Sequence, residues 1–144
     1  MGDPVTTAES VWVRSRGIRV NPLMRLLCAD DEEDIRAILR LALGLDPELE
    51  VEIVESGEEA IARAAAAPFD AILLDGMMPG LDGYETCRRL KENVVTAGVP
   101  VVFLTAKTQR EETQRALDIG ATACLTKPFD PMTIARDVRQ ALGW

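Results

Sequence analysis

Hydrophobic and polar positions from Met24 to Trp144 follow two patterns that alternate along the chain. Short apolar runs, typical of buried strands, lie at residues 26–29, 51–54, 71–74, 99–104 and 121–125. Between them, apolar residues recur at helical spacing, which predicts helices from Ile35 to about Gly44, Ser56 to about Ala66, Tyr84 to about Glu92, Thr108 to about Ile119, and from Asp130 beyond Val138. This alternation predicts an α/β fold: a doubly wound, five-stranded parallel sheet with helices on both faces.

Three of the predicted helices have recognisable start signals. Ser56 with Glu59, and Thr108 with Glu111, have the spacing of capping boxes. Asp130–Pro131 fits an N-cap residue followed by proline at the first helical position. The helix that begins at Thr108 has few apolar residues, so we expect it to be among the more mobile elements.

The chain of 144 residues is long enough for one domain with a substantial core, which we expect to span residues 24–144. Residues 1–23 mix glycine, proline, serine and threonine with isolated apolar residues, and they are predicted to form a flexible N-terminal extension. No apolar run approaches the ~18 residues of a membrane span, and the N-terminus lacks a signal-peptide core. A cytoplasmic location without membrane contact is therefore expected.

Composition narrows the classes of partner and site. The net charge of −8 argues against a nucleic-acid-binding surface and favours a cation or a basic partner. The cysteines Cys28, Cys87 and Cys124 are far apart and odd in number, and the chain contains no histidine. We therefore expect reduced thiols that pack as small hydrophobic residues, rather than a disulfide or a zinc site.

Polar residues stand at the carboxyl ends of four predicted strands. Asp30 and Asp31 follow the first strand, Asp75 the third, Thr105 the fourth and Lys127 the fifth. In open parallel sheets these ends share one edge, where ligands bind, so we expect the five side chains to lie close together. Each also has a purely structural interpretation, as a helix cap, a turn residue or a solvated lysine.

Three carboxylates that converge at this edge repel one another, so a bound cation is expected to offset their charge. At ~5 Å separation each pair would repel by roughly 3 kcal/mol at an effective dielectric constant of ~20. Mg²⁺, or Mn²⁺, suits such a site because it takes carboxylate oxygens and leaves room for a phosphate oxygen. Lys127 and Thr105 could contact further phosphate oxygens, and Asp75 could then accept a phosphoryl group.

The acidic pair, the central acid, the threonine and the lysine stand in four segments, CADDEEDIRAIL, ILLDGMMPGLDGYE, VPVVFLTAK and CLTKPFD. In their order and separation these motifs make residues 24–144 resemble the receiver domain of two-component response regulators. The resemblance implies a flavodoxin-like fold with strand order 2-1-3-4-5, an order that the hydrophobic pattern alone leaves open.

The resemblance also implies roles for the acidic residues. Asp75 would be the phosphoacceptor, attacking a phosphohistidine on a sensor histidine kinase or a histidine phosphotransfer protein. Asp30, Asp31 and Asp75 would hold the Mg²⁺ ion. The backbone carbonyl of Met77 would complete the protein ligands.

The resemblance also implies roles for the threonine and the lysine, and a surface that changes on phosphorylation. Thr105 and Lys127 would contact the phosphoryl oxygens, and the Lys127–Pro128 bond would be cis. Phosphorylation would draw Thr105 inward and repack the surface of the fourth helix, fifth strand and fifth helix, with Ala106 at an output position.

One position departs from the family pattern. Receiver domains usually have an aromatic residue three positions before the lysine, where this chain has Cys124. The output is therefore expected to run through the polar helix at 108–119. Met77 and Lys107 occupy positions at which the family tunes the lifetime of the phosphoryl group, and Lys107 also counts among the output positions.

The leading interpretation is a stand-alone phosphoacceptor switch, because the chain ends at Trp144 soon after the fifth helix. It would catalyse its own phosphorylation and dephosphorylation, and signal to an unknown target through protein contact. One alternative is a small-molecule phosphohydrolase, which would want a second acid where Met77 stands, and a cap over the site. Another is an adaptor that works without phosphorylation, which the complete set of site residues disfavours.

Overall fold

Five parallel strands form the central sheet of the protein. The computed structural model describes residues 12–13, 18–19, 23–106 and 110–144. The strands of the sheet are β3 (Met24–Ala29), β4 (Leu49–Val54), β5 (Ala71–Asp75), β6 (Val101–Ala106) and β7 (Ala123–Lys127). Their spatial order is β4-β3-β5-β6-β7, and all neighbours pair in parallel. This is the predicted 2-1-3-4-5 order, so the expected flavodoxin-like topology is confirmed.

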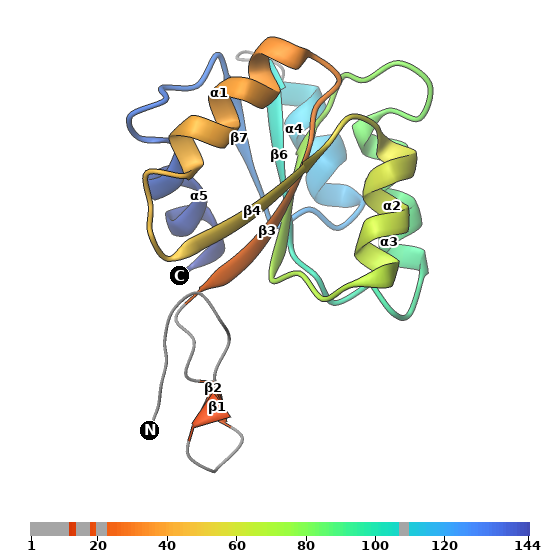
Figure 1. The fold of residues 1–144 in the computed structure, drawn as a ribbon. Coiled ribbons are helices and arrows are strands. Elements are labelled where there is room, and N and C mark those ends of the chain that lie inside the picture. The colour runs from red at the N-terminus through yellow and green to blue at the C-terminus, as the bar shows by residue number, and fades with distance from the viewer. Residues whose placement is uncertain (1–11, 14–17, 20–22, 107–109) are drawn as a thin grey trace.

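The helices cover both faces of this sheet (Figure 1). They are α1 (Glu33–Leu43), α2 (Gly57–Ala66), α3 (Gly83–Glu92), α4 (Arg110–Asp118) and α5 (Ile134–Leu142). One hydrophobic cluster joins buried residues of α1 and α5 to the sheet, and the other joins those of α2, α3 and α4. Strand β5 lies between the two clusters and is buried along its whole length, as its uninterrupted apolar sequence predicts.

Two strands start later than predicted, for reasons that lie in the chain before them. Pro100 has no N–H to donate, and the ladder of β6 begins at the next residue. Before β7, the N–H of Ala121 bonds to the carbonyl of Ala116 and Gly120 adopts a φ of 111°, so these residues complete the end of α4. Both strands also end later than predicted, so Thr105 and Lys127 lie within them rather than after them.

Helix starts agree with the sequence signals in part. Ser56 accepts a hydrogen bond from the N–H of Glu59 at 3.1 Å, whereas the Glu59 carboxylate bonds to the N–H of Glu55 rather than to that of the cap residue. The predicted helix start at Asp130 is wrong, because α5 begins at Ile134. The Asp130 carboxylate accepts instead from the N–H two residues on, which closes a turn ahead of the helix. Thr108, the other predicted cap, lies outside the described residues.

The short strands β1 (Trp12–Val13) and β2 (Ile18–Arg19) pair with each other in antiparallel fashion. Leu23, the last residue of the predicted extension, is buried. The division of the chain at residue 23 stays a prediction. Among the described helices, none has both the length and the apolar composition that crossing a membrane requires.

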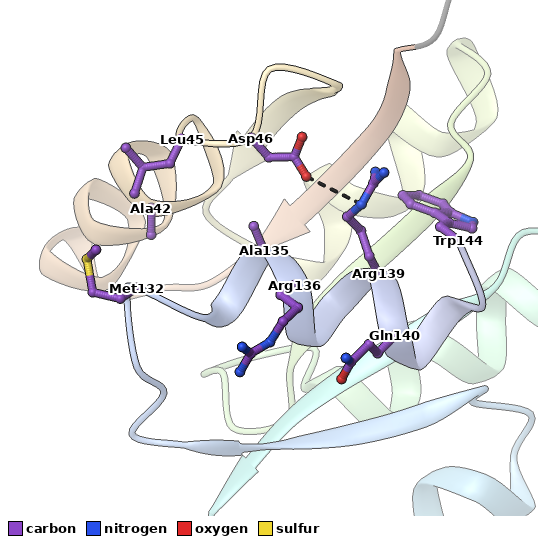
Figure 2. Close-up of a pocket in the computed structure, with 9 residues that line it drawn as sticks. All are labelled: Ala42, Leu45, Asp46, Met132, Ala135, Arg136, Arg139, Gln140 and Trp144. Atoms are coloured by element: carbon purple, nitrogen blue, oxygen red, sulfur yellow. Dashed lines mark ion pairs between the residues drawn. The ribbon is translucent and has the colours of Figure 1, made fainter.

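A groove of about 420 Å³ runs between the end of α1 and the outer side of α5 (Figure 2). The guanidinium of Arg139 on α5 reaches across it to the Asp46 carboxylate at 3.5 Å and to the Glu48 carboxylate at 2.9 Å. Both acids lie in the connection between α1 and β4, so these ion pairs link α5 to that connection. Partly exposed ion pairs of this kind contribute little to the free energy of unfolding.

Candidate functional site

The carboxyl ends of the strands bring the predicted acidic residues and the lysine together. One carboxylate oxygen from each of Asp30, Asp31 and Asp75 can be chosen so that all lie within 4.8 Å of one another. The Nζ atom of Lys127 lies 3.2 Å from Asp30 Oδ2 and 3.3 Å from Asp75 Oδ2. The structure therefore confirms the predicted proximity of these four residues, while their chemical roles stay predictions.

Asp75 is held at the end of the central strand by its own local hydrogen bond. Its Oδ1 atom accepts from the N–H of Met77 at 3.1 Å, while Oδ2 faces Lys127. Burial raises the pKa of Asp75 to about 6, and the neighbouring charge of Asp30 adds to this, whereas the Met77 N–H and Lys127 oppose it. The carboxylate is thus ionised for the most part at neutral pH, as a nucleophile must be.

Asp30 has both a structural and an electrostatic role in the fold. It is completely buried, and its Oδ1 accepts from the N–H of Glu32 at 2.9 Å, which supports the turn into α1. Its Oδ2 is left to face Lys127. Asp31 is more exposed than the other two acids, so the acidic cluster opens toward solvent on its side.

Lys127 supplies one positive charge against three carboxylates. Burial lowers the pKa of its ammonium group, but the charges of Asp75 and Asp30 outweigh burial and hold that pKa above its ordinary value. The lysine is therefore charged at neutral pH, yet it neutralises the cluster only in part. The Lys127–Pro128 bond is cis, as the resemblance implied.

The donor set of this cluster fits a hard divalent cation. All of the converging ligands are carboxylate oxygens, which Mg²⁺ and Mn²⁺ prefer, and the described residues offer no sulfur or imidazole there. The excess negative charge beside Asp75 and Asp30 gives such an ion a favourable electrostatic environment. The backbone carbonyl of Met77 as a further ligand stays a prediction.

A cavity of about 350 Å³ opens over Asp75 and Lys127. Its other lining residues are Glu32, Ile35, Met77, Leu104, Ala106 and Pro128. Thr105 is buried near the end of β6, one residue beyond Leu104, whose register partner on β5 is Asp75. The cavity can admit a phosphoryl group to the exposed side of the carboxylate, next to the lysine.

The predicted output positions lie on strands β6 and β7 where the structure describes them. Cys124 is half-buried in β7, where it is in register with Phe103 and lies 4.0 Å from the carbonyl oxygen of Thr113 on α4. Ala106 is exposed at the end of β6 and lines the cavity. Lys107 lies outside the described residues.

The sequence predicts Tyr84 only as the start of a helix and does not predict its contacts with β6 and α4. Its ring is buried and stacks on Phe103 with centroids 5.0 Å apart. Its hydroxyl lies 3.4 Å from Glu112 Oε1 on α4. The signal that could have found it is that Tyr84 is the only tyrosine of the chain and directly follows the turn after the acidic strand.

Glycines permit the close packing behind Asp75. A Cβ atom at Gly83 would collide with the carbonyl oxygen of Asp75 and lie 2.9 Å from the Cα atom of Gly76. Only a residue without a side chain allows α3 to begin against the end of β5. Gly80, in the same loop, has a φ of 74°.

Known proteins are similar to this chain in sequence and in fold. Residues 26–139 match the response regulator receiver domain family. The transcriptional regulatory protein ResD of Bacillus subtilis is 37% identical over 118 residues, which are 82% of this chain and 48% of ResD. The response regulator PleD of Caulobacter vibrioides is 40% identical over 115 residues, 80% of this chain and 25% of PleD. The chain thus spans half or less of the length of these curated relatives.

Among solved structures, the chemotaxis protein CheY4 of Vibrio cholerae superposes with a TM-score of 0.76 and 33% sequence identity. The match covers 83% of this chain and 98% of the CheY4 chain. The similarity therefore extends over the whole five-stranded sheet rather than over an isolated motif.

Proposed function

Because the chain belongs to the family of response regulator receiver domains, we propose that Asp75 accepts a phosphoryl group from a phosphohistidine in a reaction that depends on Mg²⁺. The observation that carries this proposal is the position of the Asp75 carboxylate, 3.3 Å from Lys127 and within the acidic cluster that suits a cation. The donor is a sensor histidine kinase or a histidine phosphotransfer protein.

In the proposed transfer, an oxygen of Asp75 forms a bond to phosphorus as the bond from phosphorus to the donor's imidazole nitrogen breaks. The electron pair of that bond returns to the imidazole. Lys127 offsets the charge on the phosphoryl oxygens, and the Thr105 hydroxyl donates to one of them. Bound Mg²⁺, held by Asp30, Asp31 and Asp75, would neutralise further charge and orient the phosphoryl group.

The proposed output is protein contact with a downstream target. The net charge of −8 argues against a nucleic-acid-binding output. We place the reaction in the cytoplasm, and we infer that the same residues catalyse loss of the phosphoryl group by hydrolysis.

The test is incubation with acetyl phosphate and Mg²⁺, followed by intact mass measurement. We expect one phosphoryl adduct on the native chain and none on Asp75→Asn. Asp118→Asn is a matched control, because Asp118 is an exposed acid on α4 away from the site, and it should form the adduct like the native chain. An unmodified native chain would exclude the proposed function and favour an adaptor that works without phosphorylation.

A further inference from the structure

Tyr84 touches both the acceptor loop and α4. A methyl group added at Gly76, the residue after Asp75, would lie 3.3 Å from the Tyr84 hydroxyl oxygen and 3.5 Å from two of its ring carbons. The same ring stacks on Phe103 of β6, with 27° between the ring planes. Tyr84 therefore lies close beside Gly76, the residue that follows the acceptor.

On its other side, Tyr84 holds α4 through two residues. The hydroxyl donates to Glu112, and the guanidinium carbon of Arg115 lies 4.2 Å from the ring centroid. Burial and the nearby Glu112 charge raise the pKa of Tyr84 to about 12, so the hydroxyl keeps its proton at neutral pH and can donate. Among the described residues of α4, Ala116 is the only buried one. The contacts with Tyr84 therefore add to the packing of Ala116 in holding this helix.

We propose that Tyr84 is a positioning residue that transmits the phosphorylation state of Asp75 to α4. The proposal rests on the proposed function of Asp75. Tyr84 links the two because Gly76 lies against one side of it and α4 against the other.

The initial displacement follows from the hydrogen bonds around Asp75. The N–H of Met77 donates to Asp75 Oδ1, and the N–H of Gly76 donates to the carbonyl of Leu104 at 3.0 Å. When one carboxylate oxygen becomes bonded to phosphorus, the other loses its share of the carboxylate charge, so the hydrogen bond that it accepts from the Met77 N–H weakens and the Gly76–Met77 peptide shifts. Since the Tyr84 ring lies close beside Gly76 and is stacked on Phe103, the shift changes the hydrogen bond to Glu112 and the contact with Arg115.

The first test uses the fact that the chain has one tyrosine. Protein labelled with 3-fluorotyrosine gives a single ¹⁹F resonance, from Tyr84. We expect this resonance to shift on addition of acetyl phosphate and Mg²⁺, and to stay in place in Asp75→Asn under the same conditions. Intact mass is measured on the same samples. A native chain that carries the phosphoryl adduct with an unmoved resonance would overturn the role of Tyr84, whereas a native chain without adduct would overturn the proposed function of Asp75.

The second test asks whether α4 depends on the Tyr84 hydroxyl. Tyr84→Phe keeps the ring between Phe103 and Arg115 but removes the donor to Glu112. Amide hydrogen exchange of residues 110–118 should be about fivefold faster in the unphosphorylated variant, as expected for one lost hydrogen bond. The variant should form the adduct, yet lose most of the change in exchange that phosphorylation causes in the native chain.

The matched control is Gln114→Ala, which removes the hydrogen bond of 2.9 Å between Gln114 and Asp118 on the exposed side of the same helix. It should retain the change in α4 exchange on phosphorylation. If Tyr84→Phe also retains that change in full, the helix responds by another path and the inference is wrong.

Discussion

Replacement of Asp75 by Asn should stabilise the folded protein when no divalent cation is present. Folding raises the pKa of Asp75 from 3.8 to about 6, mainly because the carboxyl group is buried. An acid whose pKa is raised in this way is harder to ionise in the folded state than in the unfolded state. Its ionisation therefore lowers the free energy of unfolding, by an amount that appears as pH rises from about 4 to 6 and is complete above.

The size of the effect follows from the same shift. The Asp75 side chain is only 4% exposed, so solvent screens it little. Each pKa unit corresponds to about 1.4 kcal/mol, and a shift of about two units costs roughly 3 kcal/mol at pH 7. This shift already includes the attraction of Lys127, so we expect the Asn variant to gain up to about 3 kcal/mol.

The measurement is urea unfolding at pH 7 in EDTA, where a gain of this size moves the midpoint up by about 1 M. Asp118→Asn, a surface change with a similar loss of charge, should stay within about 0.5 kcal/mol of the native chain. In excess Mg²⁺ the difference should narrow, because the ion stabilises the native acidic cluster by binding to the folded state. An Asp75→Asn protein that is less stable than the native chain in EDTA would refute this account of the acidic cluster.

Two further substitutions test the packing and the charge balance around the site. Gly83→Ala should lower the free energy of unfolding by about 1–3 kcal/mol, because the added methyl group would collide with the carbonyl of Asp75 and the Cα atom of Gly76. Thermal unfolding measures this loss of stability, and an unchanged melting temperature would contradict the close approach. Lys127→Met should destabilise the metal-free protein by about 2 kcal/mol, because it leaves Asp30 and Asp75 without their cation, and this cost should shrink in Asp75→Asn. Additive effects in urea unfolding would show that the lysine and the acid do not interact.

Most of the fold could be predicted because local signals and the overall topology agree. The apolar run of β5 and the cap of Ser56 each lie where the sequence suggests. The start of β6 differs from the prediction because Pro100 cannot donate to the ladder. The starts of β7 and α5 differ because the turns before them include residues whose side chains also suit strands or caps. Asp130 shows this directly, since the same carboxylate that can cap a helix instead closes a turn ahead of it.

The convergence of the acidic residues and Lys127 could be predicted because parallel strands end at one edge. The contact between Tyr84 and α4 could not be, since it joins residues 28 apart in sequence through a side-chain orientation that no periodic pattern encodes. Cys124 stands at the position where receiver domains usually have an aromatic residue. In the structure, the register partner of Cys124 in β6 is Phe103, and the ring that stacks on Phe103 is that of Tyr84 on α3.

The burial of β5 on both faces also determines where a mechanical strain at Asp75 is absorbed. Every residue of this strand is buried, so the strand is stiff and moves little under a given force. Among the described residues of α4, one is buried, so this helix is compliant. When a stiff and a compliant element are loaded together, the compliant element takes most of the displacement. If Asp75 is phosphorylated as proposed, the resulting displacement is therefore expected as movement of α4 on the protein surface, while the sheet keeps its shape.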